Sequence, residues 1–290
     1  MKNKFINVGQ VAEMIDDGSN IGLIGGGSGL VEATILHEYV EKSFLEKGKP
    51  SGLTCIHALG IGDRRSRGMN RFAHKGMVRR VIGGHWVWSP KMQMLARENE
   101  IEAYVLPGGV IMQLMREVAA KRPGLITHVG LGTFVDPLQE GGKMNEVSTK
   151  PLVERIVIDG KDYLRYLPIP IDVALLKGSI ADEDGNISLD EEPANLDVYA
   201  MAAAAHNSGG KVIFQVREKV ATGSIPARSV RIPSAIVDAV VVDPNQRQSY
   251  DIVYDPSISG ERKDTKAKPD SLKFSPRLII ARRAKQELKK

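Results

Sequence analysis

The sequence predicts an α/β protein with an open, mostly parallel sheet that is flanked by helices. Short apolar segments alternate with helical patterns along the first part of the chain, an order typical of parallel strands joined by crossover helices. Glycine-rich loops follow three of these apolar segments. Open α/β sheets bind their ligands at loops that follow the carboxyl ends of strands, so the same observations predict where a site would lie.

The composition is that of an ordinary globular chain. Of the 290 residues, 42% are hydrophobic and 26% are charged, and this length fits one large domain or two small ones. No apolar run is long enough to predict a membrane span or a secretory signal. The single cysteine, Cys55, fits a reducing, cytoplasmic compartment. Its strand-like surroundings favour a buried thiol over a nucleophile.

The positive charge of the chain is concentrated at its end. The formal net charge is +5, yet residues 261–290 hold eleven Lys or Arg against four Asp or Glu, a net of +7, which leaves −2 for residues 1–260. A nucleic-acid-binding groove would need basic residues spread over a face of the fold. We therefore expect no nucleic-acid partner and no membrane partner.

The first unit of the chain reads as a strand, a glycine loop and a helix. Asn20–Ile24 is expected to be a strand, Gly25-Gly26-Gly27-Ser28-Gly29 follows it, and Leu30–Phe44 has a helical pattern. This order aims helix N-terminal N–H groups at an anion. The loop matches neither the dinucleotide fingerprint, because Leu30 stands where its last glycine would be, nor the P-loop. Contact with an anion or acyl group and a tight turn both remain open.

Three further strands and two helices are predicted before residue 121. The strands are expected at Gly52–Ala58, Val78–Ile82 and Ile101–Leu106, and the helices at Pro90–Asn99 and from Pro107-Gly108-Gly109 to Ala120. The loop Gly60–Gly68 contains three arginines, so an anion site and a solvated loop are both open. Trp86 and Trp88 lie near glycines; packing or an interface is expected, and a ligand platform is the alternative.

The stretch from Arg122 to Asn145 completes the predicted site. Leu125–Val129 has strand composition, and glycines after it let backbone N–H groups approach a ligand. Loops that follow parallel strands share one edge of a sheet. We therefore expect three loops to lie together and to form the substrate-binding or oxyanion surface: Gly25, Gly26, Gly27 and Ser28; Pro107, Gly108 and Gly109; Gly130, Gly132 and Thr133.

The remaining elements are read from the same patterns. Helices are expected at Val8–Ile15, Leu196–Asn207 and Pro276–Leu288, and strands at Val153–Ile158, Tyr163–Tyr166, Val173–Leu176, Val212–Val216 and Ala235–Val242. The segment between Ile180 and Ile187 resembles a calcium loop but lacks the distal glutamate, so a hairpin turn is expected. Gly260–Asp270 has the composition of a linker.

The residues of a complete catalytic site are missing from the sequence. His37-Glu38-Tyr39-Val40-Glu41 lacks the second histidine of a zinc helix, and no Gly-x-Ser-x-Gly elbow occurs. The six histidines form no pairs with ligand spacing, so we expect no metal. Backbone that could cradle a ligand, without a nucleophile, suggests one half of an active site.

Several long strings of the sequence, in this order, are similar to the N-terminal half of family I CoA-transferases, in particular propionate or acetate CoA-transferases of the single-chain bacterial type. The resemblance covers essentially the whole chain. It is carried by Phe72–Gly76, Gly83–Trp86, Asn99–Tyr104, Arg122–Gly124, Val129–Pro137, Gly141–Lys143 and Ala181–Ile187. Residues 277–288 also resemble the opening helix of the C-terminal half of that family.

The resemblance implies a fold, a reaction and a partner. The fold would be CoA-transferase/NagB-RpiA-like, with an α-type domain at 1–260 and, at 261–290, a basic linker and a helix that begins or packs on a missing half. In the family a glutamate of the C-terminal half attacks an acyl-CoA, and CoA passes through a glutamyl-CoA thioester to a second carboxylic acid. We expect no catalytic residue in this chain, coenzyme A or acyl-CoA as substrate rather than as a covalent cofactor, and a hetero-oligomer with the β subunit or C-terminal half.

Two departures from the family pattern keep other activities open. Gly108 stands where the family commonly has glutamine, and Gly25–Gly29 departs from the usual Gly-Gly-Phe form. An acyl-CoA hydrolase or a C–C hydrolase on the same scaffold is therefore the first alternative. A binding or regulatory module without catalysis is the second. A relative of the sugar-phosphate isomerases is a weaker reading, because no acid/base pair is visible.

Overall fold

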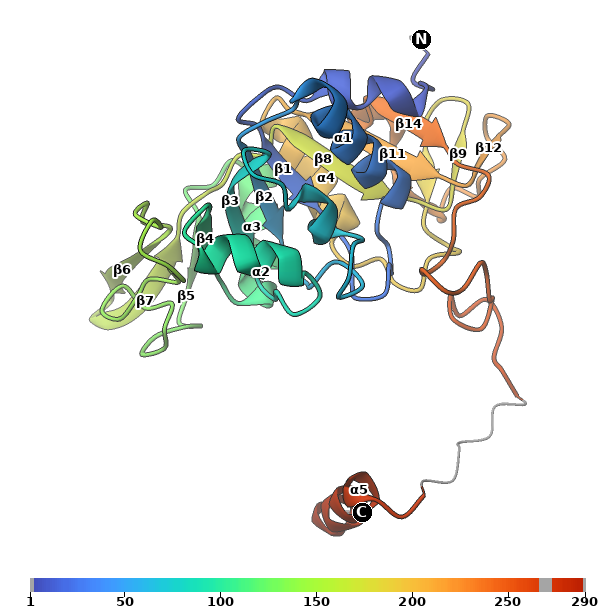
Figure 1. Ribbon diagram of the computed structural model, residues 1–290. Helices are drawn as coiled ribbons and strands as arrows, with labels where there is room; N and C mark the ends of the chain where they lie inside the picture. The colour runs from blue at the N-terminus through green and yellow to red at the C-terminus, as the bar shows by residue number, and fades with distance from the viewer. Residues whose placement is uncertain (1–2, 266–272, 289–290) are drawn as a thin grey trace.

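A seven-stranded sheet forms the centre of the computed structural model, which describes residues 3–265 and 273–288. All seven strands run parallel, in the order β14-β11-β8-β1-β2-β3-β4 (Figure 1). They are β1 (Asn20–Leu23), β2 (Leu53–His57), β3 (Val78–Gly83), β4 (Glu102–Val105), β8 (Val173–Lys177), β11 (Lys211–Val216) and β14 (Ala239–Val242). The predicted fold class is confirmed.

Helices cover both faces of this sheet. The two apolar cores of the molecule separate along it: α3 (Gly108–Ala119) and α4 (Val198–Asn207) contribute to one, and α1 (Thr34–Lys47) and α2 (Pro90–Arg97) to the other. Most residues of these strands are apolar because both faces of the sheet are covered; charged residues such as Arg79, Arg80 and Lys211 lie near the starts of their strands. At Gly22 in β1, a Cβ would lie 2.2 Å from the sulfur of Met201 in α4, so this strand requires glycine for close packing of the helix.

The order of the strands places a switch point beside β1. The chain builds β1 to β4 in one direction across the sheet and then returns to the other side of β1 with β8, β11 and β14. In open α/β sheets the carboxyl ends of the two strands at such a reversal enclose a crevice, because the loops after them diverge to opposite faces. The crevice here lies where β1 and β8 end.

Two small sheets flank the main sheet. The first is antiparallel, in the order β5-β7-β6, and lies at the end of the molecule beside β4 (Figure 1). Its strands are β5 (Leu125–Thr127), β6 (Val153–Ile158) and β7 (Lys161–Tyr166). The second, at the opposite end, consists of β9 (Ile180–Asp182), β10 (Ile187–Ser188), β12 (Glu218–Val220) and β13 (Val230–Ile232). The hairpin predicted between Ile180 and Ile187 is confirmed by the antiparallel pairing of β9 with β10.

Several predicted boundaries were wrong for identifiable reasons. The helix expected from Leu30 begins at Thr34, because Ser28, Gly29 and Val31 have positive φ and cannot continue a helix. The N-terminal helix is instead two 3-10 turns, η1 (Val8–Gln10) and η2 (Ala12–Met14). The start of the strand expected at Ala235 is η4 (Ser234–Ile236).

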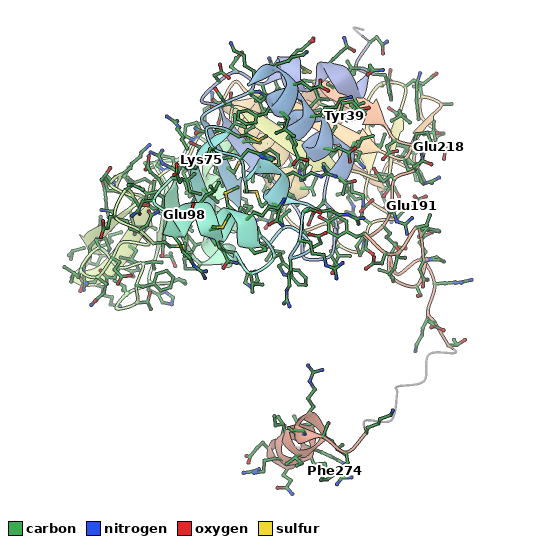
Figure 2. All side chains as sticks on the ribbon, in the orientation of Figure 1. Tyr39, Lys75, Glu98, Glu191, Glu218 and Phe274 are labelled. Carbon is green, nitrogen blue, oxygen red and sulfur yellow. The ribbon has the colours of Figure 1, made fainter. Side chains whose placement is uncertain are left out.

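Helix α5 (Pro276–Glu287) lies apart from the main body (Figure 1) and contributes no buried residue. Phe274, which Figure 2 labels just before the helix, is 82% exposed. Ile280 on the helix is 67% exposed. Part of the linker predicted at Gly260–Asp270, residues 266–270, lies outside the described residues. The boundary at 260/261 stays a prediction.

The Cys55 thiol lies in the centre of β2 and is fully buried, as the sequence predicted. Burial raises its pKa to about 12, because the thiolate would lose its hydration. We therefore expect the native chain to react with Ellman's reagent on the order of 100-fold more slowly than the urea-unfolded chain. Equal rates before and after unfolding would show that β2 is not buried as described.

Candidate functional site

The glycine loop after β1 lies on the carboxyl edge of the sheet, next to the loop after β2. Gly27 pairs with Gly62 as in a parallel ladder, and the Ser28 N–H donates to the Gly62 carbonyl over 3.1 Å. Gly26 donates its N–H to the carbonyl of Leu30 over 2.8 Å, which closes the loop on itself. The residues Gly25 to Gly29 therefore form a supported ledge at the switch point of the sheet.

The loops after β2, β3 and β4 touch one another through glycine backbones. A Cβ on Gly84 would lie 2.2 Å from the carbonyl oxygen of Ala58 and 2.9 Å from the Cα of Gly108. Pro107 precedes the first residue of α3, so Gly108 and Gly109 form its N-terminus. A Cβ on Gly109 would meet nothing within 4 Å. The space beside the Cα of Gly109 is therefore open, and the N–H groups of a first helical turn, which lack partners within the helix, could bind an oxyanion there.

The third predicted loop does not lie on this edge of the parallel sheet. Gly130, Gly132 and Thr133 follow β5, and β5 pairs antiparallel with β7 in the three-stranded sheet. The expectation that all three loops share one sheet edge is therefore wrong, because strand composition does not reveal the pairing partner. The loop reaches the end of β4 only through the following residues, where Val105 donates its N–H to the Gly142 carbonyl. Substrate contact by Gly130, Gly132 and Thr133 stays a prediction.

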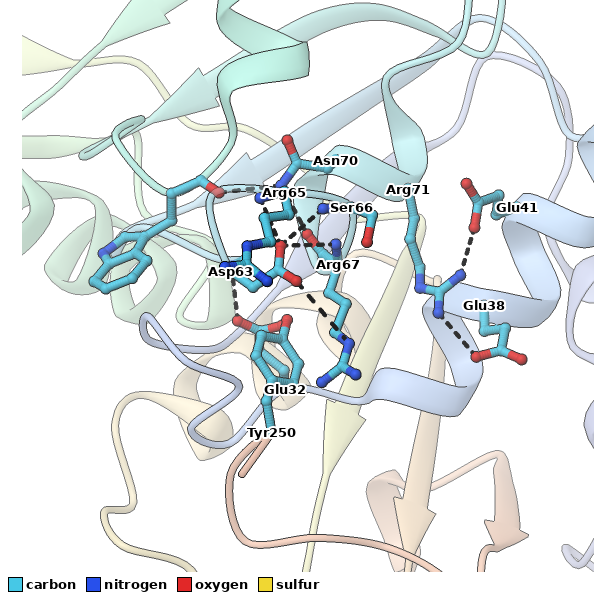
Figure 3. A network of polar contacts seen from close by, with 12 residues as sticks. Glu32, Glu38, Glu41, Asp63, Arg65, Ser66, Arg67, Asn70, Arg71 and Tyr250 are labelled. Carbon is cyan, nitrogen blue, oxygen red and sulfur yellow. Dashed lines mark hydrogen bonds and ion pairs between the residues drawn. The ribbon is translucent and has the colours of Figure 1, made fainter. Parts of the chain in front are cut away.

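A buried carboxylate, Glu32, holds the ledge in place. Its side chain is fully buried. Oε1 accepts the Gly62 N–H over 2.9 Å, and Oε2 accepts the hydroxyl of Tyr250 (Figure 3). The Tyr250 N–H in turn donates to the Ser28 carbonyl over 2.8 Å. We call Glu32, Gly62 and Tyr250 the carboxylate clamp; it joins segments that are far apart in the sequence.

The clamp explains two glycines of the ledge. A Cβ on Gly25 would lie 2.4 Å from Cγ of Glu32, and one on Gly29 would lie 2.4 Å from the ring of Tyr250. Gly29 also has φ of 83°, a conformation that other residues adopt at a cost. Glycine is therefore required at both positions to make room for Glu32 and Tyr250. Contact of the ledge with a ligand would be a separate role.

The segment that carries Tyr250 crosses the edge of the sheet from β14 back to β1. We call residues 243–255 the strap. Gln246 donates its side-chain amide to the Gly178 carbonyl over 2.7 Å, and buried Lys177, the last residue of β8, donates to the Arg247 carbonyl over 2.7 Å. Lys177 also forms an ion pair of 2.9 Å with Glu192, and both side chains are almost fully buried. The strap is thus fixed over the carboxyl ends of β11, β8 and β1.

A cavity of about 390 Å³ opens beside the ledge. Ser28, Arg65, Arg67, Trp88 and Tyr250 are among the residues that line it. Trp88 carries the Arg64 guanidinium 4.5 Å above its ring, and a Cβ on Gly27 would lie 2.2 Å from its indole. Trp86, by contrast, is 6% exposed and packs in the core. Packing is confirmed for Trp86, whereas Trp88 faces the cavity.

The arrangement offers binding groups rather than a nucleophile. Glu32 is a poor candidate for attack because both of its oxygens accept hydrogen bonds and burial separates it from the cavity. In residues 3–265 and 273–288, no group of three or more His, Cys, Asp or Glu side chains could hold a metal ion. Over the same residues, no helix is long and apolar enough to cross a membrane.

Sequence reasoning missed Glu32 and Tyr250. Glu32 stands alone between Val31 and Ala33, and a single acid in an apolar stretch was the one available signal of a buried carboxylate. Tyr250 lies in a segment with neither helical nor strand periodicity, 218 residues from its partner.

The geometry agrees with a family assignment made by comparison with known proteins. The family model described as Coenzyme A transferase matches residues 8–243. The chain therefore belongs to the coenzyme A transferase family.

Individual relatives refine this class. The chain is 42% identical over 292 residues to caffeate CoA-transferase of Acetobacterium woodii, covering 99% of this chain and 55% of that protein. It is 27% identical over 245 residues to the acetoacetyl-CoA:acetate/butyrate CoA transferase alpha subunit of Clostridium acetobutylicum, covering 84% of this chain and all of that subunit. A crystal structure of the acyl-CoA transferase YdiF of Escherichia coli O157:H7, in a thioester complex with CoA, superposes with a TM-score of 0.94 and 36% identity, covering 99% of this chain and 55% of that chain.

The chain spans about half the length of caffeate CoA-transferase and of YdiF. It is a CoA-transferase domain homologous to the N-terminal half of these proteins. The alpha subunit from Clostridium acetobutylicum is matched over its whole length by 84% of this chain.

Burial raises the pKa of Glu32 to about 7, against hydrogen bonds from Tyr250 and Gly62 that favour the ionised form. The unfolded chain releases this proton near pH 4.5, whereas the folded chain retains it, so folding stability falls as the pH rises between these values. Glu32→Gln imitates the protonated carboxyl. We expect its unfolding free energy, relative to the parent, to rise by up to about 3 kcal/mol between pH 5 and pH 8.

Urea unfolding at a series of pH values measures this difference. Glu46→Gln, on an exposed carboxylate of the following helix α1, is the control and should keep a constant offset from the parent. A constant offset for Glu32→Gln as well would contradict the protonation of the clamp.

Proposed function

We propose that this chain is the α-type half of a CoA-transferase that moves CoA from an acyl-CoA to a carboxylic acid. The attacking glutamate would lie in a second half, either a β subunit or a continuation of the chain. One observation carries the proposal: within the described residues, no glutamate lines the cavity beside the supported ledge. Its carboxylates are Asp63, whose Oδ1 accepts three backbone N–H groups, and Asp251. Alignment with only the N-terminal half of the relatives supports the same division.

The positions of the residues at the sheet edge suggest a role for each of the three loops. Gly25, Gly26, Gly27 and Ser28 would bind the acid or acyl group at the cavity lined by Ser28. Pro107, Gly108 and Gly109, at the N-terminus of α3, would stabilise the oxyanion that forms when the thioester carbonyl is attacked. Gly130, Gly132 and Thr133 would contribute from the three-stranded sheet on the β4 side.

The reaction needs these groups because a carboxylate is a weak nucleophile. Attack by the second half's glutamate puts negative charge on the carbonyl oxygen, and preorganised N–H groups in a site without water lower that barrier. The thiolate of CoA leaves as the glutamate forms an anhydride with the acyl group. The thiolate then attacks the glutamyl carbonyl, which releases the donor acid as a carboxylate and forms the glutamyl-CoA thioester. The acceptor carboxylate runs the same two steps in reverse, so that its own acyl-CoA forms and the free glutamate is regained. The YdiF crystal structure, a thioester complex with CoA, supports a thioester intermediate on this scaffold.

The hydrolase alternative rested on Gly108, which would leave room for water or a bulky acyl group. A Cβ at this position would point at the Ala58 carbonyl oxygen, 2.9 Å away, so close packing of α3 on β2 already requires glycine there. Open space lies at Gly109 instead. This observation removes the ground for the hydrolase reading.

The central experiment combines the chain with its second half and follows acyl-CoA/acetate exchange. We expect exchange from the two halves together and none from the 290-residue chain alone. Hydroxylamine or borohydride should trap a glutamyl-CoA intermediate on the second half. Hydrolysis without exchange, or exchange by the isolated chain, would contradict the proposal.

Two adjacent glycines provide a matched pair of variants. Gly109→Ala places a methyl group in open space, so we expect unchanged or higher thermal stability and a severalfold lower kcat, because the methyl group would crowd the developing oxyanion. Gly108→Ala places the same group against Ala58, and we expect a loss of about 1–3 kcal/mol of stability. Thermal unfolding and steady-state kinetics of both variants, assayed with the second half, measure the difference. Equal effects in both assays would remove Gly109 from the site.

A further inference from the structure

A second cavity, of about 320 Å³, shares Arg67 and Tyr250 with the one beside Ser28. Three guanidinium groups line it, those of Arg67, Arg71 and Arg247, and Glu38 is the one carboxylate among its lining residues. The lining side chains therefore carry a net formal charge of +2. The sequence allows the loop Gly60–Gly68, with its three arginines, to be either an anion site or a solvated loop. Arg67 of this loop lines the cavity.

Arg71 forms the fixed wall of the cavity. It bonds to Glu41 over 2.6 Å and to Glu38 over 2.9 Å (Figure 3). These two carboxylates neutralise it, so Arg71 contributes shape and hydrogen-bonding position more than charge. Arg247, which bonds to a carbonyl, and Arg67, which has one long ion pair with Asp63, carry the charge that is compensated least.

Arg67 and Arg247 are positioned by weaker contacts than those of Arg71. Nε of Arg67 lies 4.0 Å from Asp63, at the limit of an ion pair, and its guanidinium lies 4.9 Å above the ring of Tyr250 (Figure 3). The side chain of Arg247 donates to the Asp251 carbonyl over 3.0 Å, a neutral acceptor. Guanidinium groups that are held in place and retain charge bind oxyanions well, because little side-chain entropy is lost on binding.

The wall that carries Arg247 is rigid. The buried Lys177 side chain donates a hydrogen bond to the carbonyl of Arg247. Three residues later, the N–H of Tyr250 donates to the carbonyl of Ser28. Hydroxyl groups of Thr34 and Ser249 also line the cavity. Several guanidinium and hydroxyl donors around one small space match a tetrahedral oxyanion with two negative charges better than a planar, singly charged carboxylate.

The geometry points to a binding site for a phosphoryl group in this cavity, contacted by Arg67 and Arg247. This inference rests on the proposed function for the source of the phosphoryl group, because coenzyme A carries phosphates at its nucleotide end. The flexible arm between those phosphates and the sulfur would pass from this cavity to the glycine ledge. Free phosphate is the other source of the same chemistry. In either case this half of the enzyme takes part in binding the anionic ligand.

Isothermal titration of the full 290-residue chain with inorganic phosphate, CoA and 3′-dephospho-CoA tests the site. We expect Arg67→Gln and Arg247→Gln each to weaken binding by about tenfold or more. Glu38→Gln should strengthen it severalfold, because it removes a repelling carboxylate from the lining. Arg231→Gln, on the exposed part of β13, is the matched control and should leave the affinity unchanged.

The three ligands distinguish the sources. Weaker binding of dephospho-CoA than of CoA assigns the 3′-phosphate to the cavity, and equal binding that is still lost in Arg247→Gln assigns the diphosphate. An effect of the variants on phosphate alone assigns free phosphate. Unchanged affinities in both arginine variants, or no binding of any of the three ligands, would overturn the inference. The side chain of Arg247 lies outside the clamp, and Glu38→Gln has the opposite expected sign, so misfolding cannot imitate the pattern.

These titrations need no second half and no turnover. If the combined halves exchange CoA while the arginine variants bind all three ligands like the parent, the inference fails and the proposed function stands. If binding depends on the two arginines but the combined halves show no exchange, the site stands and the proposed function fails.

Discussion

The hydrogen bonds of one buried carboxylate determine the shape of the candidate site. Glu32 accepts the N–H of Gly62 and the hydroxyl of Tyr250, and so joins the loops after β1 and β2 to the strap that returns from β14. These bonds add to the backbone pairing of the Gly25–Gly29 ledge with Gly62 and Leu30. A buried acid is costly to maintain, and its placement at the switch point of the sheet indicates that the shape of this edge matters more than its stability.

The sequence was sufficient for the architecture and for two of the three glycine loops. Apolar strands separated by helical patterns identify a parallel sheet, since strands buried on both faces cannot be polar. The sequence could not show that β5 joins another sheet, because a short strand has the same composition whichever partner it pairs with. The late start of α1 was hidden as well: Val31 has a positive φ, and no local signal predicts this for a β-branched residue.

The sequence predicted where the site lies on the sheet, but it did not predict which side chains form it. Glycines in a sequence indicate positions where the backbone packs closely against another group. At Gly25 and Gly29 the neighbouring groups are the side chains of Glu32 and Tyr250 in the clamp. Contacts such as Tyr250 with Glu32 depend on how a segment without secondary structure crosses the finished sheet. The result is a sheet edge with a glycine ledge, two cavities and arginines. The chain aligns with about half of the length of each relative, and the proposed second half would supply the nucleophile that this edge lacks.

The central claim is that the carboxyl edge of the parallel sheet forms the surface on which the second half and the substrate meet. Hydrogen exchange of the chain, alone and with its second half and acyl-CoA, tests this claim most directly. The account predicts slower exchange in the ledge at residues 25–29, at the start of α3 and in the strap. Protection confined to the amino ends of the strands, with these segments unchanged, would contradict it.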